Sequence, residues 1–176
     1  MNLKKTRILA IFITFAIGFL CHFAYDLMPN FITSLLFPVN ESVWEHMKIL
    51  YTSILIYGII DYFILKKFNI EHNNFLISLF ITSFISVIIY LALFIPIYYS
   101  VGESMFISIS LLFITYILVY IINYHILKTY NLKIYKISIL PILIGYVIFG
   151  FLTYYPIKTQ LFFDTKDEIY GIKEKI

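Results

Sequence analysis

Charged residues are scarce in this chain: they make up 13% of its 176 residues, whereas 61% are hydrophobic. A soluble domain of this size has too much surface for its volume to bury such a share of apolar side chains. The basic residues stand singly or in pairs, whereas a nucleic-acid-binding surface needs them clustered on one face. The single cysteine, Cys21, excludes an internal disulfide and a multi-cysteine metal site. Composition therefore excludes a soluble globular protein and a nucleic-acid-binding protein, and it predicts that lipid is the main solvent.

Long apolar runs fill most of the sequence, and each is long enough for a membrane-spanning helix, which needs about 20 residues. We predict an all-α integral membrane bundle of about five transmembrane helices over residues 1–157. Residues 158–176 are too polar to cross again and form a predicted amphipathic tail on the outer membrane surface. The five predicted crossings are residues 8–28, 43–65, 75–99, 105–127 and 137–155.

The charges differ between the two sets of connections, and this difference predicts the orientation. One set carries most of the basic residues: Lys4, Lys5, Arg7, Lys66, Lys67, Lys128, Lys133 and Lys136, with Asp61 and Glu71 as its acids. The other set carries most of the acidic residues: Asp26, Glu41, Glu45, Glu103, Asp164, Asp167, Glu168 and Glu174. Because basic residues are retained on the cytoplasmic side, we expect a cell-membrane protein with its amino terminus inside and its tail outside. The abundance of Ile, Lys and Asn favours a low-GC bacterial source.

Titratable residues gather at the predicted outer ends of the first two helices. His22 and Asp26 are four residues apart, as are Glu41 and Glu45, so each pair shares a helix face. Imidazole and carboxylate groups bind zinc, iron or manganese, and such an ion activates water for hydrolysis. The candidate metal ligands are His22, Asp26 and His46, with Zn²⁺ as one candidate cofactor. Glu41 and Glu45 are candidate catalytic carboxylates, since a close carboxylate pair can also share a proton.

A structural interpretation of the same segment stays open. Ser42 and Glu45 fit the capping box S-x-x-E, in which the two side chains satisfy backbone donors at a helix start. Trp44 suits the aromatic belt at a membrane surface. Lys48 lies on the same helical stripe as Glu45, and His22 and Asp26 could pair with each other or with Lys48. These residues would then hold the fold together without taking part in chemistry.

Three sequence features occur together: His22-x3-Asp26, the segment Pro38-Val-Asn-Glu-Ser-Val-Trp-Glu-His-Met-Lys48, and Phe163-Asp164 followed by Tyr170-Gly171. Together they resemble a family of small bacterial multi-pass membrane proteins that share a domain of unknown function. The resemblance spans nearly the whole chain, and the motif PVNESxWEHxK is its most specific part. It implies a shared architecture and brings no established activity, substrate or cofactor. It also implies a joint role for a set of residues: Asn40, Glu41, Trp44, Glu45, His46, Lys48 and Asp164.

Three functions are compatible with these patterns. The first is a metal-dependent membrane hydrolase that acts at the outer leaflet. The second is a small ion- or proton-coupled transporter or binding protein, for which we expect a polar cavity reaching toward a cytoplasmic-side pair, Asp61 and His125. The third is a non-catalytic membrane partner or assembly subunit. The expected partner is the lipid bilayer, with a homo-oligomer or a membrane partner protein as further possibilities.

Overall fold

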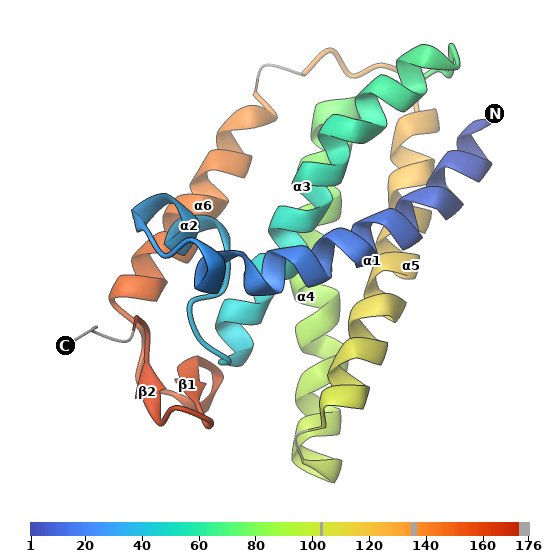
Figure 1. Cartoon of the computed structure of the whole chain (residues 1–176). Helices are drawn as coiled ribbons and strands as arrows, with labels where there is room; N and C mark the ends of the chain where they lie inside the picture. Colours follow the sequence, from blue (N-terminus) through green and yellow to red (C-terminus); the bar gives the residue numbers. More distant parts are fainter. Residues whose placement is uncertain (103, 135–136, 173–176) are drawn as a thin grey trace.

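The computed structural model describes residues 1–102, 104–134 and 137–172, which form six α-helices, a short 3₁₀ turn and a two-stranded hairpin (Figure 1). The predicted all-α membrane fold class is therefore confirmed. Three residues used in the orientation prediction lie outside the described residues: Glu103, Lys136 and Glu174. The elements are α1 (Leu3–Leu27), α2 (Phe31–Leu36), α3 (Val43–Lys67), α4 (Phe75–Val101), α5 (Met105–Lys128), α6 (Ile139–Tyr154), η1 (Gln160–Phe162), β1 (Phe163–Asp164) and β2 (Ile169–Tyr170).

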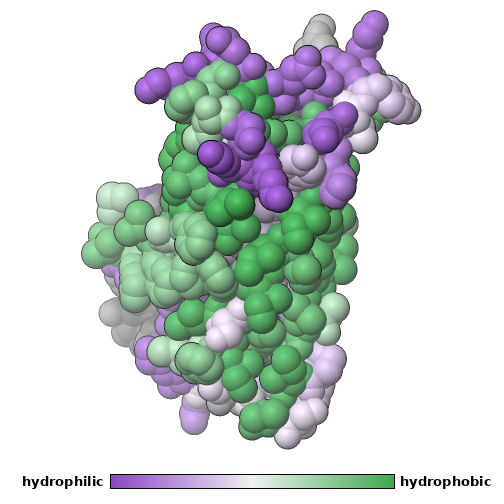
Figure 2. All heavy atoms as spheres, turned by 90° about the vertical axis from the view of Figure 1, so that its right-hand side faces the viewer, coloured by the Kyte–Doolittle hydropathy of each residue, from purple (hydrophilic) through white to green (hydrophobic). Residues whose placement is uncertain are grey.

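Four helices, α1, α3, α4 and α5, are long and apolar enough to cross a membrane. The fifth predicted crossing corresponds to α6, which has 16 residues. A helix of that length rises about 24 Å, which is less than the hydrocarbon thickness of about 30 Å. Figure 2 shows a broad hydrophobic band on one side of the molecule, with hydrophilic residues gathered at its upper end. This band is the surface expected to contact lipid.

Helices α1 and α4 extend beyond their predicted limits, each for a local reason. Helix α1 begins at Leu3 because the Asn2 side chain accepts a hydrogen bond from the backbone N–H of Lys5, 3.0 Å away. Helix α4 continues through Pro96 to Val101. Proline removes one backbone donor, and membrane helices tolerate this loss when neighbouring groups satisfy the carbonyl left behind.

The helices pack so that α1 and α4 each contact both α3 and α5, while α6 packs against α2 and α4. The amino terminus lies at one end of the bundle and the β1–β2 hairpin near the other (Figure 1). We call these the amino-terminal end and the hairpin end. The first also carries the connection at residues 68–74, and the second carries the connection at residues 37–42. The first connection has seven residues and the second has six, so each joins its two helices closely. The second connection positions the candidate site.

A buried ion pair joins α1 to α3 near the amino-terminal end. The Arg7 guanidinium, read from the sequence as a cytoplasmic flank, is buried and pairs with Asp61. Arg7 also donates to the Asn123 Oδ1, 2.7 Å away, and the Asn123 amide donates to Thr82 on α4 at 3.0 Å. The pairing considered for Asp61 and His125 is therefore wrong, because Asp61 faces α1 whereas His125 is exposed on α5. One polar network thus connects the four long helices.

The short helix α2 was not predicted, because its six residues were read as part of a connection. Asn30 caps it by accepting from the N–H of Thr33 at 3.1 Å, and the Thr33 hydroxyl accepts from the N–H of Asn30 at 3.0 Å. This reciprocal cap stabilises a helix start. Helix α2 rests on α6 at Gly150, where a methyl group would lie 2.5 Å from Cδ2 of Leu35. A larger residue at position 150 would therefore require the Leu35 side chain to shift.

Removing one partner of the Arg7–Asp61 pair should destabilise the bundle strongly. Asp61→Asn leaves the guanidinium buried without its counter-ion, a loss that costs about 3–5 kcal/mol in comparable pairs. The double variant Arg7→Met/Asp61→Leu removes both charges and should recover much of that loss. Thermal unfolding in detergent micelles measures the effect.

Lys67→Met is the matched control, since Lys67 is exposed at the same end of the bundle and should change the free energy of unfolding by less than about 0.5 kcal/mol. A wild-type unfolding temperature for Asp61→Asn would show that the pair does not stabilise the fold.

Candidate metal site

A second buried ion pair fixes the connection at residues 37–42. The Lys48 Nζ lies 2.7 Å from the Glu45 Oε2, and both side chains are almost completely buried. Lys48 also donates to the carbonyl of Ser34 in α2, at 2.7 Å. The Glu45 Oε2 accepts from the N–H of Val39 at 3.0 Å, and its Oε1 accepts from the Thr153 hydroxyl of α6 at 2.7 Å. Glu45 and Lys48 therefore join α2, α3, α6 and the connection that leads into α3.

The predicted capping box at the start of α3 is half formed. The Ser42 hydroxyl accepts from the N–H of Glu45 at 3.3 Å, as the prediction requires. The N–H of Ser42 is instead satisfied by the Asn40 Oδ1 at 2.9 Å, because the Glu45 carboxylate is turned toward Lys48 and Val39. Ser42 is thus the helix cap, whereas Glu45 is a buried residue that does not contribute to the cap.

The tail folds over the same connection. The Asn40 amide donates to the carbonyl of Gly171 at 2.7 Å, and the N–H of Glu41 donates to the Asp164 Oδ2 at 2.9 Å. The other oxygen of Asp164 accepts from the N–H of Lys166 at 2.8 Å. The backbone of Gly171 has a φ of +67°, a left-handed conformation that suits glycine. These bonds hold the backbone of Glu41 from the side opposite α3.

The Glu41 side chain lies close to two histidines. Its Oε2 lies 3.3 Å from the Nε2 of His46 on α3 and 3.8 Å from the Nε2 of His22 on α1. One ligand atom from each of the three residues lies within 4.8 Å of the others. All three side chains are half-buried, so the cluster is reached from outside while its imidazoles rest against the bundle. Two helices and one connection thus bring together three residues that bind divalent transition metals.

The orientation of His46 follows from its backbone contact. Its Nδ1 lies 2.9 Å from the carbonyl oxygen of Ser42, and because a carbonyl only accepts, the Nδ1 must carry the proton. A neutral His46 therefore directs the lone pair of its Nε2 at a carboxylate oxygen of Glu41. Two acceptors facing each other at 3.3 Å need a proton or a cation between them. Metal-bound histidines are oriented in the same way, with the second ring nitrogen donating to a carbonyl or a carboxylate.

The Glu41 carboxyl is more acidic than an ordinary glutamate when a proton occupies the space between it and the His46 Nε2. In that form the hydrogen bond from His46 and the positive charges of His46, His22 and Lys166 lower the pKa of its carboxyl from 4.5 to about 2, against the opposing effect of partial burial. The Lys166 Nζ lies 4.0 Å from the Glu41 Oε1, and its side chain is 74% exposed. The site therefore consists of one carboxylate, two imidazoles and a lysine at the rim.

An apolar cavity of about 270 Å³ opens beside the cluster. His22, Glu41 and His46 all line it, and its remaining walls come from α1, α3, α4 and α5. The apolar lining residues include Phe19, Phe23, Ile49, Phe94, Ile109 and Leu112. The cluster is therefore the polar end of a mostly apolar chamber, an arrangement typical of ligand sites.

Other residues singled out from the sequence lie outside the cluster. Asp26 is exposed on the last turn of α1 and is not part of the group formed by His22, Glu41 and His46. The Trp44 ring stacks on Phe162 of the tail, with ring centroids 4.9 Å apart, and packs on Phe149 of α6. Trp44 therefore docks the tail onto the bundle. Lys166 was not singled out, because nothing in the sequence places an exposed tail lysine beside Glu41.

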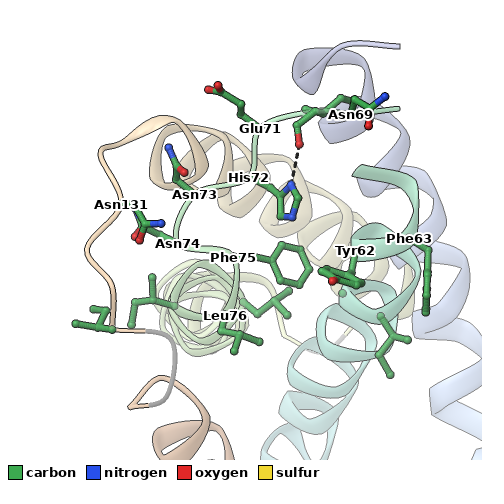
Figure 3. Close-up of a pocket in the computed structure, with 16 residues that line it drawn as sticks. Tyr62, Phe63, Asn69, Glu71, His72, Asn73, Asn74, Phe75, Leu76 and Asn131 are labelled. Atoms are coloured by element: carbon green, nitrogen blue, oxygen red, sulfur yellow. Dashed lines mark hydrogen bonds between the residues drawn. The ribbon is translucent and has the colours of Figure 1, made fainter. Parts of the chain in front are cut away.

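A larger cavity, of about 970 Å³, lies at the amino-terminal end between α3, α4 and the connections (Figure 3). Its histidine, His72, donates from Nδ1 to the carbonyl of Ile70 at 2.7 Å. The His72 ring also packs edge-on against Tyr62 and Phe75, with centroids 6.0 Å away in each case. The side chain of Asn74 is bonded to the connection that precedes α6. These polar groups serve local packing, so size alone does not make this cavity the candidate site.

A family model described as a family of unknown function (DUF6512) matches residues 1–172, and the chain therefore belongs to this family. The predicted membership of an uncharacterised family is confirmed. No curated protein and no solved structure matches the chain. The family assignment supplies no activity.

The two glutamates of the motif should differ sharply in their effect on stability. Glu45→Gln leaves Lys48 buried without a counter-ion and should lower the free energy of unfolding by about 3–5 kcal/mol. Glu41→Gln is the matched control: its ion pairs are partly exposed, and such pairs contribute about 0–1 kcal/mol. Chemical or thermal unfolding of metal-free protein in detergent measures both values. Equal losses in the two variants would contradict the division between a structural Glu45 and a chemical Glu41.

Proposed function

We propose that this member of the DUF6512 family binds one divalent transition metal ion, with Zn²⁺ as the best fit, through His22, Glu41 and His46. We further propose that the bound ion serves hydrolysis at the outer surface of the cell membrane. The convergence of these three side chains beside an apolar cavity is the observation that carries the proposal.

The spacing of the ligand atoms suits zinc. Bonds of about 2.0–2.1 Å in a tetrahedral site keep neighbouring ligand atoms about 3.4 Å apart. The Glu41 Oε2 lies 3.3 Å from one imidazole nitrogen and 3.8 Å from the other. The ligand atoms of His22 and His46 lie within 4.8 Å of each other, so closing the set around an ion requires them to approach by up to about 1.4 Å. A carboxylate and two imidazoles form a ligand set that zinc enzymes use.

The ligand count favours catalysis over a structural role. Structural zinc sites are closed by four protein ligands, whereas catalytic sites have three and leave a position for water or substrate. Zinc in such sites lowers the pKa of bound water to about 7. In ester hydrolysis the water oxygen bonds to the acyl carbon or phosphorus, the bond to the leaving oxygen breaks, and that oxygen takes a proton. The open side of the cluster, toward the cavity and Lys166, is where a substrate would approach.

The orientation supports an outward-facing site. The amino terminus lies at one end of the bundle and the β1–β2 hairpin near the other (Figure 1). Lys4, Lys5, Lys66 and Lys67 belong to the amino-terminal end, whereas Glu41 lies in the connection at residues 37–42. Under the positive-inside rule the cluster would face outward. The interior gives less support to a transporter, since Tyr116, Tyr120 and Tyr57 are buried and packed between the cluster and the Arg7–Asp61 pair.

Zinc binding tests the first half of the proposal. Protein purified in detergent and stripped with a chelator should bind one Zn²⁺ per chain in a calorimetric titration. His22→Ala and His46→Ala should each weaken zinc binding by at least about 100-fold. Mutation of a residue that only hydrogen-bonds to a zinc ligand already weakens metal binding about 10–100-fold. His72→Ala and His125→Ala are matched controls, because these two histidines lie away from the cluster, and they should bind as wild type does.

Hydrolysis of ester and phosphoester lipids by the zinc-loaded protein tests the second half. Activity should disappear on chelation, return with Zn²⁺ and be absent in Glu41→Gln. Zinc binding that is equal in wild type and His46→Ala would overturn the site, and a zinc-loaded protein without hydrolytic activity on any lipid ester would overturn the reaction.

A further inference from the structure

Exposed apolar side chains form part of the wall of the cavity beside the cluster. Phe19, Phe23 and Met105 line it and are 39%, 53% and 80% exposed. These side chains belong to α1 and α5, two helices expected to span the membrane. A chamber bounded by exposed apolar side chains of membrane-spanning helices can be entered from the bilayer.

A second apolar slot starts from the same carboxylate. Its volume is about 130 Å³, and Glu41, Val43 and Phe94 line both cavities. Its other walls come from the outer turns of α4 and from the tail, and include Ile95, Tyr98, Leu161 and Phe163. Two apolar chambers of unequal size thus diverge from one polar group.

Lys166 adds a positive charge beside Glu41, the residue from which the two cavities diverge. The Lys166 Nζ lies 4.0 Å from the Glu41 Oε1, and its side chain is exposed. A lysine is a common phosphate ligand, and a metal ion at the neighbouring imidazoles would add further positive charge. The polar end of the chamber therefore suits an anionic headgroup, while its walls suit hydrocarbon.

We infer that the ligand of this site is a phospholipid of the outer leaflet, with its phosphate between Lys166 and the His22–Glu41–His46 cluster and its two acyl chains in the two cavities. The inference rests on the proposed function for the role of the metal and deepens it by naming the substrate class. One turn of a partner protein's transmembrane helix, about 10–12 Å across and 5.4 Å long, occupies roughly 420–610 Å³, which is more than chambers of 270 and 130 Å³ hold. Segments of acyl chain are far thinner than a helix and suit chambers of this size.

Native mass spectrometry of delipidated protein in detergent, titrated with phosphatidylglycerol, tests the inference. One lipid should bind per chain. Ile109→Trp fills the larger cavity from α5 and should weaken lipid binding about tenfold or more. A tenfold loss corresponds to the burial of roughly two methylene groups. Ile121→Trp is the matched control, because Ile121 is exposed on the same helix and lines neither cavity. It should bind as wild type does.

The headgroup is tested with Lys166→Gln, which should weaken binding of phosphatidylglycerol more than that of a diacylglycerol without phosphate. Lys158→Gln, at an exposed tail lysine away from the cluster, is its control and should change neither. Equal lipid binding by Ile109→Trp, Ile121→Trp and wild type would overturn the inference, as would a stoichiometric partner protein that displaces the lipid.

Each titration is repeated with zinc-loaded and chelated protein, so that the two proposals fail separately. Saturable lipid binding that Ile109→Trp abolishes, in a protein that binds no zinc, supports the lipid site and overturns only the metal. Stoichiometric zinc without saturable lipid binding supports the metal site and overturns the lipid inference.

Discussion

The buried ion pair between Glu45 and Lys48 is the interaction on which the rest of the site depends. Two charges in a low-dielectric interior are tolerated only when geometry and additional hydrogen bonds compensate their desolvation. Here Ser34, Val39 and Thr153 supply those bonds. The pair therefore holds α2, α6 and the connection before α3 in one arrangement. That arrangement presents Glu41 to the two histidines.

Polar residues at different positions along the bundle have different roles. The Arg7–Asp61 network joins the long helices at the amino-terminal end and is almost completely buried. At the hairpin end Glu45 and Lys48 are equally buried, while the cluster one turn away is half-buried. Polar groups inside a membrane protein are commonly associated with function. In this protein the fully satisfied groups hold the helices together, and the partly exposed ones face a cavity that a ligand can enter.

Local rules in the sequence predicted the long helices, the Ser42 cap and the alignment of Lys48 with Glu45, because each depends on spacing within one helix. They did not predict that Asp61 would face Arg7, since that requires knowing which helices are neighbours. The expected grouping of Asp26 with His22 followed a shared helix face, but the four-residue offset puts Asp26 at the exposed end of α1. Helix α2 was too short for periodicity to identify. Lys166 comes to the site only through the fold of the tail, which tertiary contacts with Asn40 and Glu41 determine.

Zinc X-ray absorption spectroscopy of the purified, zinc-loaded protein tests whether His22, Glu41 and His46 hold one metal ion. We expect a first shell of two imidazole nitrogens and one or two further oxygen ligands at about 2.0–2.2 Å, with one imidazole lost in His46→Ala. A spectrum without imidazole scattering, or one that is unchanged in both His22→Ala and His46→Ala, would contradict this ligand assignment.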